Sequence, residues 1–372
     1  MYAIYWAHGR ESSISTLGRS FIEPIQSVNT LDSLSPRVKV GFIGVGSNAV
    51  DHVASVSELG HTVVAGCATS ENTLRWRRFK KVAPEARFIP TVSSLIGAPD
   101  VNAIVACLPW NVTQTWLTEL IATPKPLLLE KPAALSSSYL EKALAAPDAT
   151  CHNKVVGFNR RFYKTVQRLK KRVDQGGVKT AEVVISETVK LFSKKFGPEI
   201  VPSIPVYSSC HILDVAMYIL GDVQPVRTYT YQERGKLAPF KSLTSLMETS
   251  GGIPVSLIAV AENPLPVGIR VLFDDQTTWH LSPMERLIAF EGYRTIEPAK
   301  GYNVRKYIPE PFLEISENET FKPGFLEQMK TFLEGPQSNV AATLSDQLVL
   351  LRFIELIYSN TAGSKDTIQS GR

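Results

Sequence analysis

The chain has 372 residues, more than one hydrophobic core usually organises, so two domains are expected. Hydrophobic residues make up 44% of it and charged residues 20%, and no apolar run approaches the roughly 20 residues that cross a bilayer, which excludes a membrane-spanning protein. The net charge of +5 comes from 40 basic and 35 acidic residues spread along the chain, which excludes the clustered basic stripe of a nucleic-acid-binding protein.

The cysteines and the two ends of the chain narrow the class further. The four cysteines lie far apart and form no CxxC pair, so we expect neither a metal site nor a disulfide framework. Residues 1–37 lack the apolar core of a secretion signal. We therefore expect a cytoplasmic protein in which residues 1–37 are an extension that lies on the body of the protein or on a partner subunit. Residues 362–372 are polar, and we expect a frayed tail there.

Regular patterning begins at residue 38, where strand-sized apolar runs alternate with helix-like stretches. We expect a first strand at 38–43 followed by a helix to 59, further strands at 61–67, 102–108, 126–129 and 155–158, and helices at 73–82 and 113–122. Apolar strands joined by helices are typical of a parallel sheet with right-handed crossovers. The pattern predicts a doubly wound Rossmann domain over residues 38–158, an α/β fold.

The pattern changes after about residue 175, where strand-like runs follow one another directly. We expect strands at 181–189, 226–231, 243–249, 255–262, 269–274 and 277–281, and helices at 209–220, 325–333 and 344–358. This order predicts an α+β domain over residues 159–361 with an open, mainly antiparallel sheet. Because an open sheet leaves a face to be covered, we expect a homodimer or homotetramer.

The first candidate site is the turn after the first strand, with the sequence GVGSNA at residues 44–49. In a G-x-G-x-x-A turn, Gly44 permits the tight turn and Gly46 lets the backbone approach a pyrophosphate. The small Ala49 allows close packing of helix on strand, and the helix that opens at Ser47 and Asn48 favours an anion. The turn predicts dinucleotide binding; the alternative is a Gly-rich turn with no ligand.

The second predicted strand ends in the sequence GCATS, at residues 66–70, where an acidic residue would bind the ribose 2′-hydroxyl of NAD. No carboxylate occupies this point. Thr69 and Ser70 can donate hydrogen bonds to a 2′-phosphate, and Arg75 can pair with it. We therefore predict NADP as the cofactor, with NAD as the alternative. The alternative for the basic residues at 75–81 is that they form a solvated helix face that binds no ligand.

The second candidate site is Glu130-Lys131-Pro132, which follows the apolar run 127–129. A lysine at the carboxyl end of a parallel strand points into the crevice where such sheets bind ligands. As a cation and donor, Lys131 can orient a sugar hydroxyl or polarise a carbonyl. Pro132 fixes the loop that presents it.

Together these motifs resemble the glucose-fructose oxidoreductase / inositol dehydrogenase / MocA (Gfo/Idh/MocA) family. Its most specific element here is Glu-Lys-Pro after the strand at 126–129. The sequence VVGFNRRF at 155–162 is similar to the family's passage into its second domain, and CHILD at 210–214 to its catalytic helix. Residues 325–329 and 344–346 are similar to its C-terminal pattern, so the resemblance covers residues 38–358.

The resemblance implies hydride transfer between nicotinamide and a sugar or cyclitol carbon. His211 would be the general acid/base, Lys131 would hold the reacting oxygen, and Asp214 would orient the histidine or bind substrate. Where the family often has an aspartate one turn before the histidine, this chain has Tyr207, which makes Tyr207 a rival proton donor. For His211, the alternative is a satisfied histidine that packs against the sheet.

The resemblance also implies contacts around these residues. Leu108, Pro109, Trp110 and Glu130 would lie beside the cofactor, although the family usually has Pro-Asn where this chain has Pro109-Trp110. Asn159, Arg160 and Arg161 would bind substrate, the arginines through a phosphate or carboxylate. The alternative for the two arginines is a solvated helix start.

These observations predict an NADP-preferring oxidoreductase that interconverts alcohol and ketone on a sugar, cyclitol or sugar nucleotide in carbohydrate biosynthesis. Two alternatives stay open. One is a reductase of a non-sugar imine or tetrapyrrole on the same scaffold, which Trp110 and Tyr207 leave open. The other is a nucleotide-binding regulator without turnover, which the departures at Tyr207 and Thr113 favour and the retained Lys131 and His211 oppose.

Overall fold

The computed structural model describes residues 37–231, 241–301, 303–317, 321–335 and 339–359. The predicted extension, apart from its last residue, and the predicted C-terminal tail lie outside the described residues. Within these ranges, no helix combines the length and the apolar character needed to cross a membrane.

The first sheet has six parallel strands in the order β3-β2-β1-β4-β5-β6. They are β1 (Lys39–Ile43), β2 (Thr62–Cys67), β3 (Arg87–Ile89), β4 (Ala103–Ala106), β5 (Leu127–Leu129) and β6 (Lys154–Val156). The helices between them are α1 (Ser47–Glu58), α2 (Leu74–Val82), α3 (Val92–Ile96), α4 (Thr113–Ala122) and α5 (Ser137–Leu144). Every residue of β4 and β5 is buried, as expected for strands covered on both faces. The predicted Rossmann sheet is confirmed, and β3, α3 and α5 are additions to the prediction.

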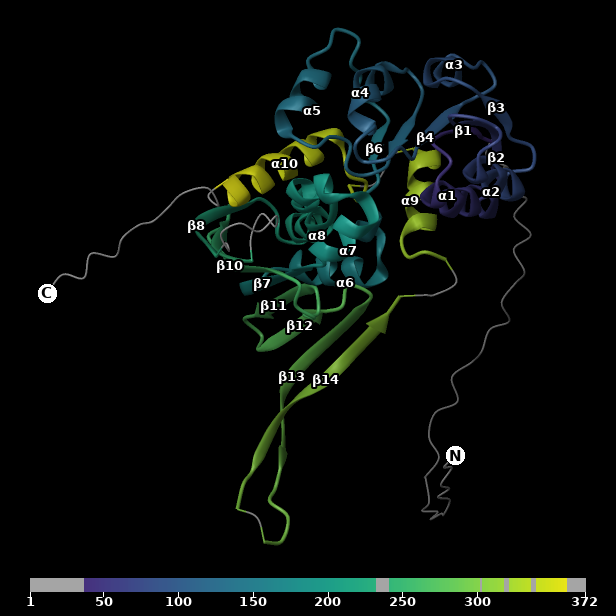
Figure 1. Ribbon diagram of the computed structural model, residues 1–372. Helices are drawn as coiled ribbons and strands as arrows, with labels where there is room; N and C mark the ends of the chain where they lie inside the picture. Colours follow the sequence, from purple (N-terminus) through teal and green to yellow (C-terminus); the bar gives the residue numbers. More distant parts are fainter. Residues whose placement is uncertain (1–36, 232–240, 302, 318–320, 336–338, 360–372) are drawn as a thin grey trace, which may run out of the picture. The chain divides into compact units, whose positions relative to one another are not determined.

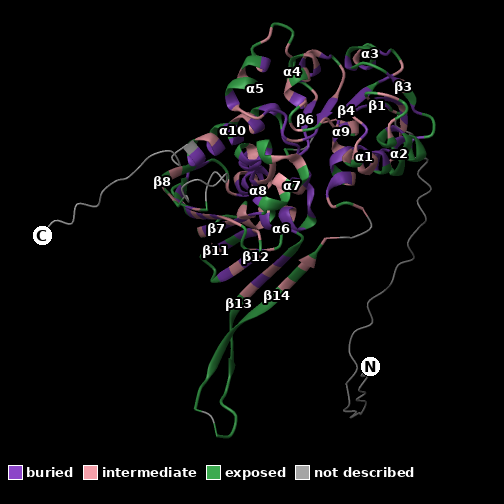
Figure 2. Ribbon diagram, viewed as in Figure 1, coloured by how far each residue is buried: buried purple, intermediate pink, exposed green. Residues whose placement is uncertain are grey.

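The second sheet has eight strands in the order β14-β13-β12-β11-β7-β10-β9-β8, and only β7 and β10 pair in parallel. Its strands are β7 (Val178–Glu187), β8 (Val223–Tyr231), β9 (Ser242–Thr249), β10 (Pro254–Ala261), β11 (Gly268–Phe273), β12 (Thr277–Leu281), β13 (Arg286–Ile296) and β14 (Lys306–Ser316). The mainly antiparallel sheet is therefore confirmed. The prediction missed β13 and β14, a long hairpin whose distal half is exposed on both faces, as Figures 1 and 2 show.

Helices cover one face of this second sheet. They include α6 (Lys164–Val173), which contacts β12, β13 and β14, and α8 (Cys210–Leu220), which contacts β7. Along β9, buried and exposed residues alternate, which places one side of the strand against the helices and the other in solvent. The face that the helices leave uncovered carries exposed apolar side chains, among them Tyr229 and Leu246.

The last two helices return toward the first sheet. α9 (Phe325–Glu334) packs against α1 and lies beside it in Figure 1. Its buried Met329 and Phe332 belong to the same apolar cluster as Val40 and Phe42 of β1. α10 (Leu344–Ser359) contacts α5, α8, β6 and β8. The C-terminal segment therefore packs against both sheets.

Candidate functional site

The turn between β1 and α1 has the backbone that the sequence predicts. Gly44 has φ +87°, and a Cβ there would collide with the carbonyl oxygen of Cys107, so only glycine fits. Gly46 caps α1 and faces open space, with no atom within 4 Å of the position of a Cβ. Ala49 is fully buried, and no side chain caps the first turn of α1 at Ser47. Free backbone N–H groups at an open helix N-terminus fit the pyrophosphate of a dinucleotide.

The segment after β2 contains an acidic residue, Glu71, that the prediction did not include. Thr69 and Arg75 are exposed, whereas Ser70 hydrogen-bonds the backbone N–H of Asn72 through its hydroxyl. The sequence reasoning missed Glu71, an exposed acid that lines a surface depression of about 470 Å³. The other lining residues are Asn72, Trp76, Arg77, Lys80 and Lys81. A carboxylate and three cations therefore share the surface where the ribose of a dinucleotide is expected.

Glu130, directly after β5, turns toward α1. Its Oε1 lies 2.8 Å from Nε2 of the buried His52, and its Oε2 accepts the backbone N–H of Lys131. Burial acts to raise the pKa of Glu130, but the hydrogen bond and charge of His52 and the charges of Lys131 and Lys322 outweigh it, so the pKa is lowered. Glu130 thereby fixes the loop that carries Lys131, and a direct contact with cofactor stays a prediction.

Lys131 reaches across to the segment before α8. Its Nζ donates a hydrogen bond of 2.8 Å to the backbone carbonyl of Tyr207 and lies 4.7 Å from the centre of the Tyr207 ring. The carbonyl and the π face together hold the ammonium. Tyr207 belongs to a single π-helical turn (Pro205–Ser209) immediately before α8, and such turns often occur at functional sites.

Aromatic side chains surround Tyr207. Its ring meets those of Phe192 and Phe196 edge to face, at centroid distances of 5.6 and 5.4 Å. Both belong to α7 (Val189–Phe196), a helix that the sequence analysis did not predict. Trp110 and these three rings pack against one small apolar cluster, which consists of Val189, Ile200, Val201 and Ile204. Burial raises the pKa of the Tyr207 hydroxyl, and the neighbouring Cys210 and Glu130 raise it further.

His211 lies four residues after Tyr207, in the first turn of α8. Its Nδ1 is buried without a hydrogen-bond partner among the described residues. Burial, and then the positive charges of Lys131, Arg160 and Lys322, lower the pKa of this imidazole well below its usual value. The ring is therefore neutral at pH 7 and can accept a proton.

A cavity of about 190 Å³ opens beside His211. Polar side chains from four segments line it, including Arg160, Glu187, Ser208 and Glu285. Glu187 is 2% exposed, and burial raises its pKa, against hydrogen bonds from Ser209 and Ser208 and the charges of Lys131 and Arg160. The sequence reasoning missed Glu187, although it occupies the position after Ala181, Val183 and Ile185 on the buried face of β7.

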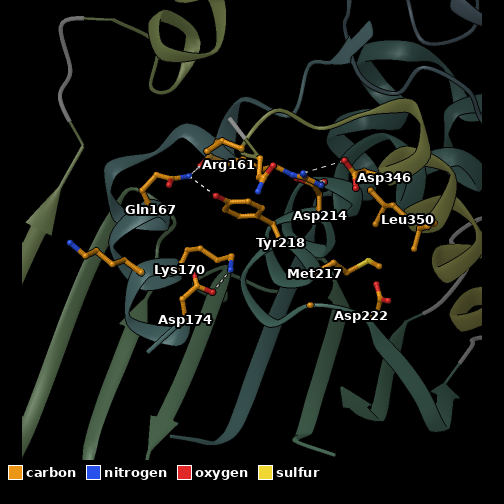
Figure 3. Close-up of a pocket in the computed structure, with 15 residues that line it drawn as sticks. Arg161, Gln167, Lys170, Asp174, Asp214, Met217, Tyr218, Asp222, Asp346 and Leu350 are labelled. Carbon is orange, nitrogen blue, oxygen red and sulfur yellow. Dashed lines mark hydrogen bonds and ion pairs between the residues drawn. The ribbon is translucent and has the colours of Figure 1, made fainter. Parts of the chain in front are cut away.

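Arg161 and Asp214 lie apart from the cavity beside His211. The guanidinium donates to both carboxylate oxygens at 2.7–3.1 Å, and Asp346 lies 3.6 Å from it. The pair lines a second cavity of about 550 Å³ between α6, α8 and α10, which Figure 3 shows and which shares no lining residue with the first. Because Arg161 is buried, the solvated alternative is wrong for it, whereas substrate binding by Arg161 and Asp214 stays a prediction.

The structure thus brings part of the predicted set together. Lys131 and Tyr207 are in contact, and His211 and Arg160 share the smaller cavity. Asn159 instead donates a hydrogen bond of 2.9 Å to the carbonyl of Pro323. Leu108, Pro109 and Trp110 follow β4, where Thr113 hydrogen-bonds the carbonyl of Pro109.

Comparisons with known proteins agree with this architecture. No protein-family model matches the sequence. Inositol 2-dehydrogenase from Acidothermus cellulolyticus is 33% identical over 146 residues, which is 38% of this chain and 42% of that protein. The chain spans about half the length of the curated relatives it matches.

Two solved structures share the fold over most of the chain. An oxidoreductase from Agrobacterium radiobacter, in complex with NAD+, L-tartaric acid and magnesium, covers 88% of this chain and 97% of its own, with TM-score 0.67 and 18% identity. The WlbA dehydrogenase from Bordetella pertussis, in complex with NADH and UDP-GlcNAcA, covers 87% and 95%, with TM-score 0.63 and 16% identity. At these identities the likeness shows the fold alone. The partial matches to inositol 2-dehydrogenases agree with the resemblance to the Gfo/Idh/MocA oxidoreductase family that the motifs at Gly44 and Lys131 carry, and the solved structures show the shared fold.

Proposed function

We propose that the chain is an NAD(P)-dependent oxidoreductase that interconverts an alcohol and a ketone on a sugar, cyclitol or sugar nucleotide. The observation that carries the proposal is a neutral imidazole, with Nδ1 unpartnered among the described residues, on which the positive charge of Lys131 acts. His211 faces a polar cavity, and Lys131 is held at the carbonyl four residues earlier. A base and a cation that reach the same substrate oxygen, as we propose for His211 and Lys131, suit removal of an alcohol proton.

The roles of the residues follow from their environments. The nicotinamide of a bound dinucleotide would supply the hydride chemistry. His211 accepts the hydroxyl proton of the substrate, since burial and nearby cations keep its imidazole unprotonated at neutral pH. Lys131 binds the same oxygen and stabilises the negative charge that develops on it. An unprotonated base suits the oxidative direction.

We assign Tyr207 a positioning role rather than proton donation. Its hydroxyl is harder to ionise than an ordinary tyrosine, because burial and two neighbours raise its pKa. Its ring face and its carbonyl both hold Lys131. The ring thus takes the place of the aspartate that the family often has one turn before the histidine.

The proposed substrate class rests on the cavity beside His211. Carboxyl and hydroxyl groups at Glu187, Ser208 and Glu285 can exchange hydrogen bonds with the hydroxyls of a polyol. Arg160 supplies a positive charge that suits a substrate with a carboxylate or phosphate. A sugar acid or a sugar nucleotide would meet both conditions.

For the cofactor we propose a preference for NADP. Three cations, Arg77, Lys80 and Lys81, line the depression after β2 against the single carboxylate Glu71. Isothermal titration with NADPH and NADH tests this, and equal or reversed affinity would refute it. Glu71→Ser should then widen the preference for NADPH, because it removes the one group that repels a 2′-phosphate.

A cofactor-reduction assay over a panel tests the function itself. The panel contains inositols, free sugars, sugar acids and UDP-sugars, each with NAD+ and NADP+. Turnover of at least one member that is lost in His211→Ala supports the proposal. Cofactor binding without turnover of any member would favour the regulator, and turnover of a cyclic imine alone would favour the imine reductase.

A further inference from the structure

A lysine from the far end of the chain lies beside the glycine turn. Nζ of Lys322 is 3.2 Å from Oδ1 of Asn48 and 3.2 Å from Oδ2 of Asp51. Asn48 belongs to the turn and first helical residues that fit a pyrophosphate, and Asp51 lies one residue beyond the first turn of α1. The Lys322 side chain is still 43% exposed, so its ammonium can contact a ligand there.

The segment that carries Lys322 is held by specific contacts. Asn159 donates to the carbonyl of Pro323, and Gly324 has φ +74° with no room for a Cβ against the carbonyl of Asn159. The ammonium of Lys322 also lies 4.2 Å from the centre of the Phe325 ring at the start of α9. These contacts position the ammonium before any ligand arrives, which reduces the entropy lost on binding.

A series of further contacts connects Phe325 to Lys131. The Phe325 ring stacks on His52 at 4.5 Å, His52 hydrogen-bonds Glu130, and Glu130 accepts the backbone N–H of Lys131. The charge of Lys322 acts on Glu130 and on His211. The segment that carries Lys322 is thus connected, through Phe325, His52 and Glu130, to the loop of Lys131.

The turn itself lacks a cation. Residues 44–49 contain no lysine or arginine, so the turn offers an anion only backbone N–H groups and the end of a helix. A dinucleotide pyrophosphate carries two negative charges, and a cation at hydrogen-bond distance strengthens its binding. In the structure Asp51 balances the charge of Lys322, and an arriving anion would compete with Asp51 for it.

We propose that Lys322 is a pyrophosphate ligand of the dinucleotide, supplied to the Rossmann turn by the segment that leads into α9. The inference rests on the proposed dinucleotide binding and adds a residue outside the nucleotide-binding motif. It predicts that Asp51 and Lys322 act in opposite directions. Lys322 strengthens binding of the anion, whereas Asp51 weakens it.

The test is isothermal titration of the full chain with NADPH, NADH, ADP and adenosine. Lys322→Gln should weaken binding of ADP and of both dinucleotides by about 5- to 30-fold, the range for one partly exposed charged hydrogen bond, and leave adenosine unchanged. Asp51→Asn should tighten ADP binding, and Lys322→Arg should keep it. The matched control is Lys330→Gln on α9, which makes the same charge change beside Glu334 and should alter nothing.

Each other outcome overturns the inference. If Lys322→Gln binds ADP like the wild type, Lys322 is not a ligand. If Lys322→Gln and Asp51→Asn weaken ADP binding alike, their ion pair is structural only. If Lys322→Gln loses adenosine and ADP equally, the variant has distorted the whole site. A wild-type protein that binds neither NADPH nor NADH would instead refute the proposed function on which the inference rests.

Discussion

Asp214→Asn separates a structural role of the aspartate from a catalytic one. Arg161 is 6% exposed and Asp214 is 2% exposed, and three hydrogen bonds join them. Burial acts to lower the pKa of Arg161, but the charge and hydrogen bonds of Asp214, together with the charges of Asp346 and Tyr218, outweigh it and raise the pKa. The amide of asparagine has the same size as the carboxylate, but it leaves the guanidinium buried without its main counter-charge.

The expected cost follows from that geometry. Removing one partner of a buried ion pair costs about 3–5 kcal/mol. Asp346 retains part of the interaction at 3.6 Å but is 42% exposed, so we expect the lower end, about 3 kcal/mol. For a domain of this size that lowers Tm by about 6–12 °C. Replacing both partners by apolar residues, Arg161→Met with Asp214→Leu, should recover most of the loss.

Thermal unfolding followed by circular dichroism measures this effect. Turnover of the folded Asp214→Asn protein, measured below its transition, should stay within about threefold of wild type, because the pair and His211 face different cavities. The reasoning is refuted if Tm is unchanged while kcat falls by about 100-fold or more. That outcome would make Asp214 a partner of His211 or of the substrate.

Three further predictions follow from the site and the open sheet. His211→Ala should lower kcat by about 10²- to 10⁴-fold with little change in cofactor affinity. Because the pKa of His211 is depressed, wild-type kcat/KM for oxidation should be level from neutral pH to below pH 6.5 and fall only in stronger acid. A fall centred at or above pH 6.5 would contradict this. Tyr207→Phe should keep most of the turnover and Tyr207→Leu should lower it by about 3- to 30-fold, since leucine keeps the backbone carbonyl but loses the ring face that holds Lys131. If Tyr207→Phe abolishes turnover while His211→Ala does not, the tyrosine is the proton donor. Light scattering should give a dimer or tetramer, and a monomer of 41.1 kDa at micromolar concentration would exclude both.

Elements with a strong local signal could be predicted from the sequence. The run at 38–43 and the glycines after it identify β1, the turn and α1, because buried parallel strands are apolar throughout and the turn needs glycine at φ +87°. The hairpin β13–β14 could not be predicted in the same way. Its distal residues, such as Tyr293 and Tyr307, are exposed on both faces, so no alternation of apolar and polar residues marks the strands.

The residues of the candidate site also differ in how clearly the sequence marks them. Lys131 and His211 lie in short motifs that the sequence displays directly. Glu187 carried a weaker signal, a carboxylate in phase with the buried residues of β7. Lys322 had no local signal, since it meets Asp51 only across 271 residues of chain. Contacts of that kind depend on the tertiary fold, which periodicity does not report.

The position of α9 has a consequence for the order in which the protein is made. The ribosome completes all six strands of the first sheet by residue 156, but the helix that covers α1 begins only at Phe325. Until then the apolar surface that Met329 and Phe332 will bury stays open. A nascent chain therefore exposes this apolar surface while more than 150 further residues are synthesised, and chaperones can bind it during that time. A fragment that stops after the first sheet would expose that surface permanently, so a fragment built around the first sheet should include α9.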